Sequence, residues 1–407
     1  MKRFLMIGFL LFSILALTFA GGKPAKPADS NVVTLTLGNW STTENDQWTL
    51  GFAGLEEELG IKVTYRVYPS DSEFWDKIPA EIAAGTSVDM VVSSNEHYLQ
   101  FINQGLFLPL DDAIADGTIN INQLISSALE SWQLDGVTYG IPYSVNPGLL
   151  IINVNLWKQM GFGAYPQTWD DVLEICKEYK AKTGKPALVM NIQEYHLTNY
   201  ALSFGGGWGF GKTINTPQNA KALQFIIDAY RNGYSITPSE LGLGWDGAVM
   251  LQGETLFSTG GPWYYSSFRE DAPDIELKYL PVPRGAGAAS GLTLHTGAIV
   301  ALKGTKHLPE IKKAIGYAYA HDALARAVVD VSGMIPADKN MHSYYRQKFP
   351  MFVDLIDYSE TGKPFGYPSQ SKRFADALIS EMQSVMFDRN SKRTGQDIVT
   401  ALARQFQ

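Results

Sequence analysis

The sequence lacks several features that particular protein classes require. It contains one cysteine, Cys176, among 407 residues, so no disulfide can form within the chain. Charged residues make up 18% of it, the formal net charge is −8, and no long basic run occurs, so we expect no nucleic-acid partner. The six histidines show none of the short spacings of metal sites. We therefore expect no metal and no cofactor, and a buried, unreactive thiol at Cys176.

A long apolar run stands at the N-terminus. Two basic residues precede the apolar segment 4–19, and small residues follow from Ala20. This order is typical of a secretory signal peptide, and the run is short for a span of the bilayer. We predict a signal peptide over residues 1–20 that is cleaved after Ala20. Because the only cysteine lies far from this end, we expect no lipid anchor and a periplasmic location.

Predicted strands and helices alternate in the first part of the remaining chain. We expect strands at 32–37, 61–68 and 88–92, and helices at 46–59 and 72–84. This alternation is typical of an α/β fold with a largely parallel sheet. Ligands bind beyond the carboxyl ends of the strands in such sheets, which makes Asn39, Trp40 and Asn95 candidate ligand residues.

A second α/β set follows the proline-containing extended segment 140–148. We expect helices at 168–183, 217–232 and 309–331, a strand at 187–190, and a further extended segment at 291–302. The extended segments are suited to crossing between two lobes. The predicted lobes comprise residues 31–143 with 296–337, and residues 144–295 with 338–407.

Residues 206–213 match the phosphate-binding pattern G-x-x-x-x-G-K-[ST]. That motif requires a helix that begins at its lysine, so that the first amides face the phosphate. Here Thr216 as the N-cap and Pro217 at the first helical position predict a later helix. We interpret the match as coincidental.

The segment 253–265 is the most informative part of the chain. It contains a turn, a short apolar strand and a Gly-Gly-Pro break, followed by three aromatic residues. Glycine allows close approach of the backbone and proline stiffens the exit, so Trp263 is expected at the end of the strand. A rigid indole at such a rim suits the apolar face of a sugar ring. A tryptophan of the core beside a turn is the alternative.

Two other chemistries remain open at this stage. The adjacent Tyr264 and Tyr265 suit ferric iron, which phenolate oxygens can ligate. Glu96 and Glu194 are a conceivable carboxylate pair of a secreted glycosidase. The sequence contains no G-x-S-x-G nucleophile motif.

Four further segments carry a resemblance to a known family. They are AAGTSVDM at 83–90, NQGLFLPL at 103–110, DGVTYGIP at 135–142 and PQTWDD at 166–171. They resemble, in the same order, motifs of the extracellular solute-binding proteins of ABC importers, in the branch of the maltose/maltodextrin-binding protein. The resemblance covers nearly all of the chain after the predicted signal peptide. It implies a type II fold of two lobes, each a mostly parallel sheet flanked by helices, with a ligand cleft between them and no catalysis.

The resemblance also implies roles for individual residues. Trp263 matches the tryptophan of the branch's NGPW motif, which stacks on a glucosyl ring. Glu194 matches a glutamate that accepts sugar hydroxyls, and Glu96 falls on an acidic ligand residue. Asn146 falls where the branch has a glutamate beside the hinge. The other residues of the predicted ligand-binding set are Trp40, Asn39, Asn95, Tyr143 and Trp208.

The function that the resemblance implies is capture of a solute by closure of the two lobes. The solute is expected to be a neutral sugar, a disaccharide or an oligosaccharide, because no arginine cluster stands among the candidate residues. The expected partner is an inner-membrane ABC permease, and the expected oligomeric state is a monomer.

Overall fold

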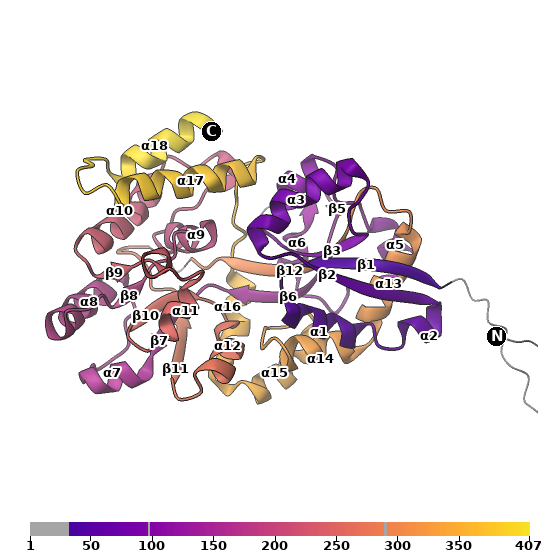
Figure 1. The fold of residues 1–407 in the computed structure, drawn as a ribbon, viewed down its shortest axis with the longest axis horizontal. Helices are drawn as coiled ribbons and strands as arrows, with labels where there is room; N and C mark the ends of the chain where they lie inside the picture. Colours follow the sequence, from indigo (N-terminus) through magenta and orange to yellow (C-terminus); the bar gives the residue numbers. More distant parts are fainter. Residues whose placement is uncertain (1–31, 97, 289–290) are drawn as a thin grey trace, which may run out of the picture.

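The computed structural model describes residues 32–96, 98–288 and 291–407. The predicted signal peptide, 1–20, lies outside them. Two five-stranded sheets, each flanked by helices, form two lobes that stand side by side (Figure 1). The predicted α/β fold with two lobes is confirmed.

The first lobe contains a sheet with the strand order β2-β1-β3-β12-β6. Its strands are β1 (Val33–Asn39), β2 (Ile61–Val67), β3 (Met90–Ser94), β6 (Ile141–Pro147) and β12 (Leu294–Ala301). Both neighbours of β1 are parallel to it, whereas β12 is antiparallel to β3 and to β6. The sheet is therefore mixed, with one reversed strand.

Helices cover both faces of this sheet. They are α1 (Thr42–Gly51), α2 (Leu55–Leu59), α3 (Asp71–Ala84), α4 (Tyr98–Asn103), α5 (Asp111–Ala115), α6 (Ser126–Glu130), α13 (Leu308–Ala320) and α14 (Asp322–Asp330), with a hairpin of β4 (Gln133–Leu134) and β5 (Val137–Thr138). Side chains of neighbouring strand positions point to opposite faces. Val92 accordingly packs into one hydrophobic cluster and Val91 into another.

The second lobe contains a sheet with the order β11-β7-β10-β8-β9, in which β7 is the reversed strand. Its strands are β7 (Leu149–Asn153), β8 (Leu188–Val189), β9 (Ser235–Ile236), β10 (Phe257–Gly260) and β11 (Leu277–Pro281). Its helices are α7 (Val154–Met160), α8 (Trp169–Thr183), α9 (Glu194–Ser203), α10 (Pro217–Arg231), α11 (Asp246–Met250), α12 (Tyr264–Asp271), α17 (Ser371–Met386) and α18 (Gly395–Phe406). Cys176 of α8 is buried, as predicted, and burial raises the pKa of its thiol.

Within the part of the chain that the structure describes, three segments cross between the lobes. Strand β6 leads through Gly148 directly into β7 of the other sheet, and β12 returns the chain to the first sheet. The third is segment 362–370, which joins α16 (Leu355–Thr361) to α17; α15 (His342–Lys348) precedes α16. A Cβ atom at Gly148 would lie 2.1 Å from Asn199 Oδ1, so any larger residue here would have to displace the buried Asn199 side chain. Of the predicted lobe boundaries, 143/144 falls within β6, 295/296 falls within β12, and 337/338 lies between α14 and α15; all three remain predictions.

Local sequence explains where helix α10 begins. The Thr216 side chain accepts a hydrogen bond from the Asn219 amide, and Pro217 occupies the first turn. Asn219 is fully buried and fills the preceding loop, where its amide nitrogen donates to Gly207 O at 3.0 Å and Thr213 O at 2.8 Å. The later helix start is therefore confirmed, and the loop that matches the phosphate-binding pattern encloses a buried side chain.

Two predicted helices are each divided in the structure. The expected helix 309–331 is α13 followed by α14, because His321 adopts extended angles of φ −121° and ψ 145°. The expected helix 46–59 is α1 and α2, separated by a turn in which Gly54 has φ +89°. A Cβ at Gly54 would also lie 2.6 Å from the Tyr317 hydroxyl, so both packing and backbone favour a break here.

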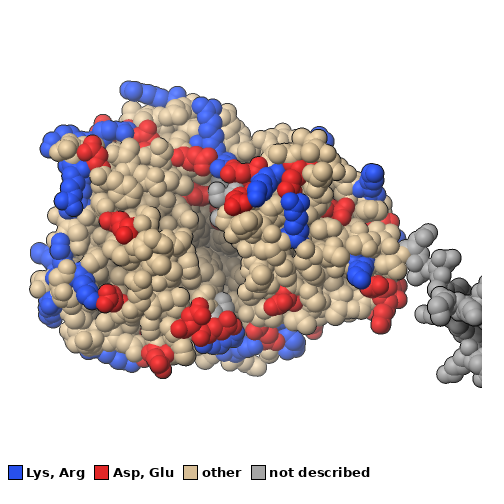
Figure 2. Space-filling view, in the orientation of Figure 1, with Lys and Arg blue, Asp and Glu red and all other residues tan. Residues whose placement is uncertain are grey.

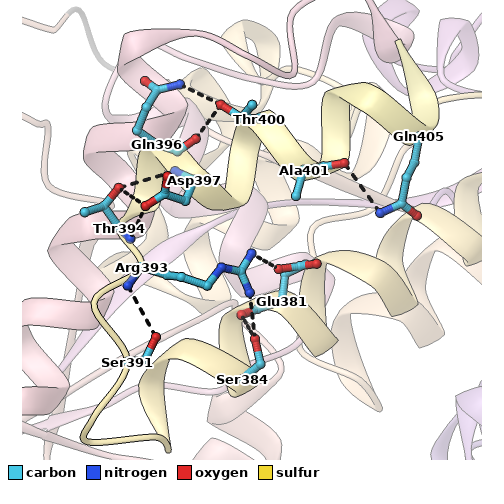
Figure 3. Close-up of polar contacts among 10 residues, drawn as sticks. All are labelled: Glu381, Ser384, Ser391, Arg393, Thr394, Gln396, Asp397, Thr400, Ala401 and Gln405. Carbon is cyan, nitrogen blue, oxygen red and sulfur yellow. Dashed lines mark hydrogen bonds and ion pairs between the residues drawn. The ribbon is translucent and has the colours of Figure 1, made fainter.

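The C-terminal helices α17 and α18 pack against each other and against α10 in the second lobe (Figure 1), and Figure 3 shows the polar contacts within and between them. Arg393, in the connecting loop, forms an ion pair with Glu381 of α17. The Thr394 side chain accepts from the Asp397 amide while the Asp397 carboxylate accepts from the Thr394 amide at 2.8 Å. This reciprocal cap fixes the start of α18.

Candidate functional site

Four rings meet where the two lobes join. Trp263 follows β10, Tyr195 lies in the first turn of α9, His295 lies on β12, and Phe365 lies on the crossing segment 362–370. The ring centre of Trp263 is 5.5 Å from that of Tyr195 and 5.6 Å from that of His295. Phe365 lies 5.9 Å from Tyr195 and 6.4 Å from His295. We call these four residues the aromatic cluster. Figure 2 shows a hollow between the lobes, with Asp and Glu side chains along its rim.

Trp263 stands at the strand end, as the sequence predicts. It is partly exposed and packs against both of the largest hydrophobic clusters, rather than within either one. A Cβ at Gly261 would lie 2.1 Å from the Trp263 ring, and a Cβ at Gly260 would lie 2.4 Å from the Tyr264 ring. The glycine pair therefore allows both rings to fold back over the end of β10.

Two carboxylates approach the aromatic cluster. Glu96, just after β3 in the first lobe, lies with Oε1 3.2 Å from His295 Nε2. Glu194 begins α9 in the second lobe and is partly exposed. Burial raises the pKa of Tyr367, and the charges of Glu194 and Glu96 raise it further. Both carboxylates therefore act on the same phenol, one from each lobe.

A buried polar network includes Tyr264, the residue that follows Trp263. Asp246, at the start of α11, accepts hydrogen bonds from Asn191 at 3.0 Å, from Ser258 at 3.2 Å and from the Tyr264 hydroxyl. Its Oδ1 also lies 3.3 Å from His196 Nε2. Burial alone would raise the pKa of Asp246, but the charge and hydrogen bond of His196, with Tyr264 and Asn191, outweigh it and lower that pKa.

Three predicted ligand asparagines form bonds within the protein. Asn95 donates to Leu294 O at 2.9 Å and accepts from Thr296 N at 3.0 Å, which ties the end of β3 to β12. The Asn146 side chain donates to the sulfur of Met334 at 3.4 Å and accepts from the Ile335 amide at 3.3 Å. These two amides support the crossing strands.

The side-chain amide of Asn39 is bound in the same way. It donates to Asn45 at 2.5 Å and accepts from the Ser41 amide at 2.9 Å. This bonding holds the turn that follows β1. The side-chain amides of Asn39, Asn95 and Asn146 thus have partners within the protein, and their contact with a ligand stays a prediction.

The other predicted aromatic residues lie outside the aromatic cluster. Trp208 is fully buried in the core of the second lobe, where its indole donates to Thr198 at 2.9 Å. Tyr143 is buried with its ring edge-on to Trp48 at 5.5 Å. Trp40 is partly exposed and lies 5.0 Å from the Phe74 ring of the first lobe.

Sequence reasoning missed Tyr195, His295 and Phe365 as members of the site. Tyr195 follows Glu194 directly, so its neighbour was a usable signal. His295 and Phe365 carry no motif, and only the crossing segments bring them to Trp263. His295 lies in segment 291–302, which was expected to cross between the lobes, and this position was the one sequence feature that indicated a place in the candidate site.

The geometry disfavours the two-tyrosine iron site. Tyr264 is fully buried and its hydroxyl is bound to Asp246, and burial, with the Asp246 charge, raises its pKa well above the usual value. Tyr265 instead packs against Phe349, 4.9 Å away between ring centres. The two tyrosine side chains therefore have different neighbours and do not share one site. The raised pKa also makes Tyr264 poorly suited to become the phenolate that would bind iron.

Comparison with known proteins identifies the family. Residues 39–325 match the model of the bacterial extracellular solute-binding protein family. The chain belongs to this family. It is a solute-binding protein of the kind that serves ABC importers, and the family consists of binding proteins without catalytic activity. The glycosidase alternative is thereby set aside.

Known relatives are distant but span most of the chain. An arabinooligosaccharide-binding protein of Halalkalibacterium halodurans is 24% identical and covers 79% of this chain and 78% of its own. The maltose-bound MalE3 of T. maritima is 18% identical, with a TM-score of 0.79 over 92% of this chain and 98% of its own. A substrate-binding protein of Listeria monocytogenes in complex with cycloalternan is 17% identical, with a TM-score of 0.81 over the same shares. These structures share the two-lobed fold.

Proposed function

We propose that this protein captures a neutral sugar, a disaccharide or an oligosaccharide, between its lobes and delivers it to an inner-membrane ABC permease. The observation that carries the proposal is the partly exposed Trp263 beside Tyr195 and His295, with Glu96 and Glu194 approaching from opposite lobes. Aromatic faces match the C–H face of a sugar ring. Carboxylates accept the hydroxyl hydrogen bonds that would otherwise be lost on burial.

Residues on both lobes give the ligand a preference for the closed arrangement. Glu96 belongs to the first lobe, and Trp263 and Glu194 belong to the second. A sugar that contacts all three binds better when the lobes are together, and this difference in affinity shifts the equilibrium toward closure. The relatives support the sugar class, since one binds arabinooligosaccharides and one structure holds maltose.

The proposed location is the periplasm, after cleavage of the leader at Ala20 and without a lipid anchor. The family supports export, since its members are extracellular binding proteins. Over the residues described by the structure, no helix combines the length and apolar character needed to cross a bilayer. Mass spectrometry of the native protein tests the proposal, and an acylated N-terminus would contradict it.

A thermal-shift screen of the mature protein tests the sugar proposal. The panel contains maltose, maltotriose, arabinotriose and xylotriose, with ferric citrate as the iron arm. A ligand at a hundredfold excess over its Kd adds about 2.7 kcal/mol to the free energy of unfolding. We expect a rise in Tm with at least one sugar, which chromatography then recovers unchanged. A rise with ferric citrate alone would contradict the sugar proposal.

A further inference from the structure

The Asp246 carboxylate forms a hydrogen bond or an ion pair with a side chain of each segment of the second lobe that carries a proposed ligand residue. Asp246 is 4% exposed, and its two carboxylate oxygens bind Asn191, His196, Ser258 and Tyr264. These four partners come from the loop before α9, from α9, from β10 and from α12. Asp246 itself belongs to α11, which contributes no residue to the aromatic cluster.

The partners of Asp246 are sequence neighbours of the proposed ligand residues. Tyr264 directly follows Trp263. Its hydroxyl is also 2.9 Å from Ser258 Oγ, and its ring packs edge-on to Trp245 at 5.3 Å between ring centres. The Tyr264 side chain is therefore held at both its ring and its hydroxyl, which fixes the first turn of α12 and the backbone of Trp263.

A second set of contacts leads from Asp246 to α9. His196 lies with Nε2 toward Asp246 and with Nδ1 2.9 Å from Thr259 Oγ1, so both ring nitrogens are engaged. The preceding residue, Tyr195, donates its hydroxyl to Gly260 O at 2.9 Å. Two adjacent residues in the first turn of α9, Tyr195 and His196, thus each form a hydrogen bond to β10.

We propose that Asp246 is the positioning residue of the sugar site. Through Tyr264 it sets the orientation of Trp263, and through His196 it sets Tyr195 and Glu194, without touching the ligand. A buried carboxylate suits this task because it accepts several hydrogen bonds at once, and hydrogen bonds to a charged acceptor are stronger than neutral ones. Binding sites need such supporting bonds to hold their contacting residues within about 0.5 Å of the productive geometry. The inference rests on the proposed function.

Asp246→Asn is the matched substitution, because asparagine keeps the shape while one acceptor oxygen becomes a donor that faces other donors. Calorimetry at 20 °C, with the panel sugar that wild type binds most tightly, should show a Kd at least tenfold higher. The effect of Trp263→Ala should be smaller in the Asp246→Asn background than in wild type, because a displaced platform has less affinity to lose. Ile226→Ala, in the core of α10, is the control: it should lower Tm and leave Kd within twofold.

A measurement without ligand separates this inference from the proposed function. The near-ultraviolet circular dichroism of wild type minus that of Trp263→Phe isolates the signal of Trp263. We expect Asp246→Asn to lose that signal. A retained signal, a Kd within twofold of wild type, or additive effects with Trp263→Ala would each overturn the positioning role. Absence of binding to every panel sugar would instead refute the proposed function, whatever the dichroism shows.

Discussion

Lys372, in the first turn of α17, joins the second lobe to the first. Its ammonium group lies 3.2 Å from Asp76 of α3, and its backbone amide donates to Gln100 of α4 at 2.9 Å. Burial alone would lower the pKa of Lys372, but Asp376 and Asp76 outweigh it and raise that pKa, so the side chain stays charged. If the lobes separate in the ligand-free protein, the pair with Asp76 contributes only to the closed form. Lys372→Met should therefore weaken sugar binding.

The expected magnitude follows from exposure. The side chain of Asp76 is 60% exposed and that of Lys372 is 22% exposed. Exposed ion pairs contribute at most about 1 kcal/mol. Lys372 also keeps its partner Asp376, on its own helix, when the lobes part. We therefore expect a loss of about 0.5 kcal/mol, which is about a twofold rise in Kd.

Calorimetric titration of the bound sugar at low and high NaCl is the assay. Salt screens surface charges, so the affinity of wild type should fall toward that of Lys372→Met as the salt concentration rises, while the variant changes little. Lys158→Met is the control, because the pair of Lys158 with Glu276 lies within the second lobe. If Lys372→Met and Lys158→Met have equal effects, or the variant retains the salt dependence of wild type, the interlobe role is wrong.

Four further changes have defined outcomes. The pKa of Asp246 is lowered in the folded protein, so the ionised carboxylate stabilises the fold above its unfolded pKa, and this stabilisation is lost as pH falls through the folded pKa. Urea titrations should therefore show Asp246→Asn less stable than wild type by about 2 kcal/mol at pH 6. The difference should be smaller below about pH 4. Tyr264→Phe should lower Tm, and neither wild type nor variant should develop a visible charge-transfer band with ferric citrate. Gly148→Ala should destabilise by more than about 2 kcal/mol in urea, because its Cβ would overlap the Asn199 side chain. Phe210→Gly should raise the free energy of unfolding by about 1 kcal/mol, since Phe210 is exposed at φ +54°, where side chains are strained; unchanged stability would contradict that strain.

Local sequence predicted the elements well where short-range chemistry decides them. The pair Thr216 and Pro217 set the start of α10, and the Gly-Gly-Pro break placed Trp263 at the end of β10. Local sequence did not predict a helix boundary where one residue within a helical pattern adopts an extended backbone conformation. An alanine-rich, evenly patterned segment does not reveal that His321 is extended, because no proline or glycine marks the break.

The candidate site was predicted only in part, because burial and partners arise from tertiary structure. Asn95 follows an expected strand and Asn146 lies within an expected crossing segment, yet their amides are bound by backbone and side chains that are distant in sequence. Trp208 is chemically suited to a sugar platform but is buried in the core. His295 and Phe365 join Trp263 only through the crossing segments, so residue type alone could not identify them.

We propose that Trp263 is a platform for a sugar ring, and two quantities measured on Trp263→Ala test this role together. Truncating an aromatic anchor at a binding site commonly costs about 2 kcal/mol or more of affinity, about a thirtyfold rise in Kd. Truncating a tryptophan of the core costs about 3–5 kcal/mol of folding stability instead. We therefore measure Kd for the panel sugar by calorimetry and the free energy of unfolding in urea. Phe387→Ala, at an exposed aromatic residue after α17, is the control. We expect a rise in Kd of at least thirtyfold with little change in the free energy of unfolding. A variant that binds sugar normally but unfolds much more readily would contradict the platform role of Trp263.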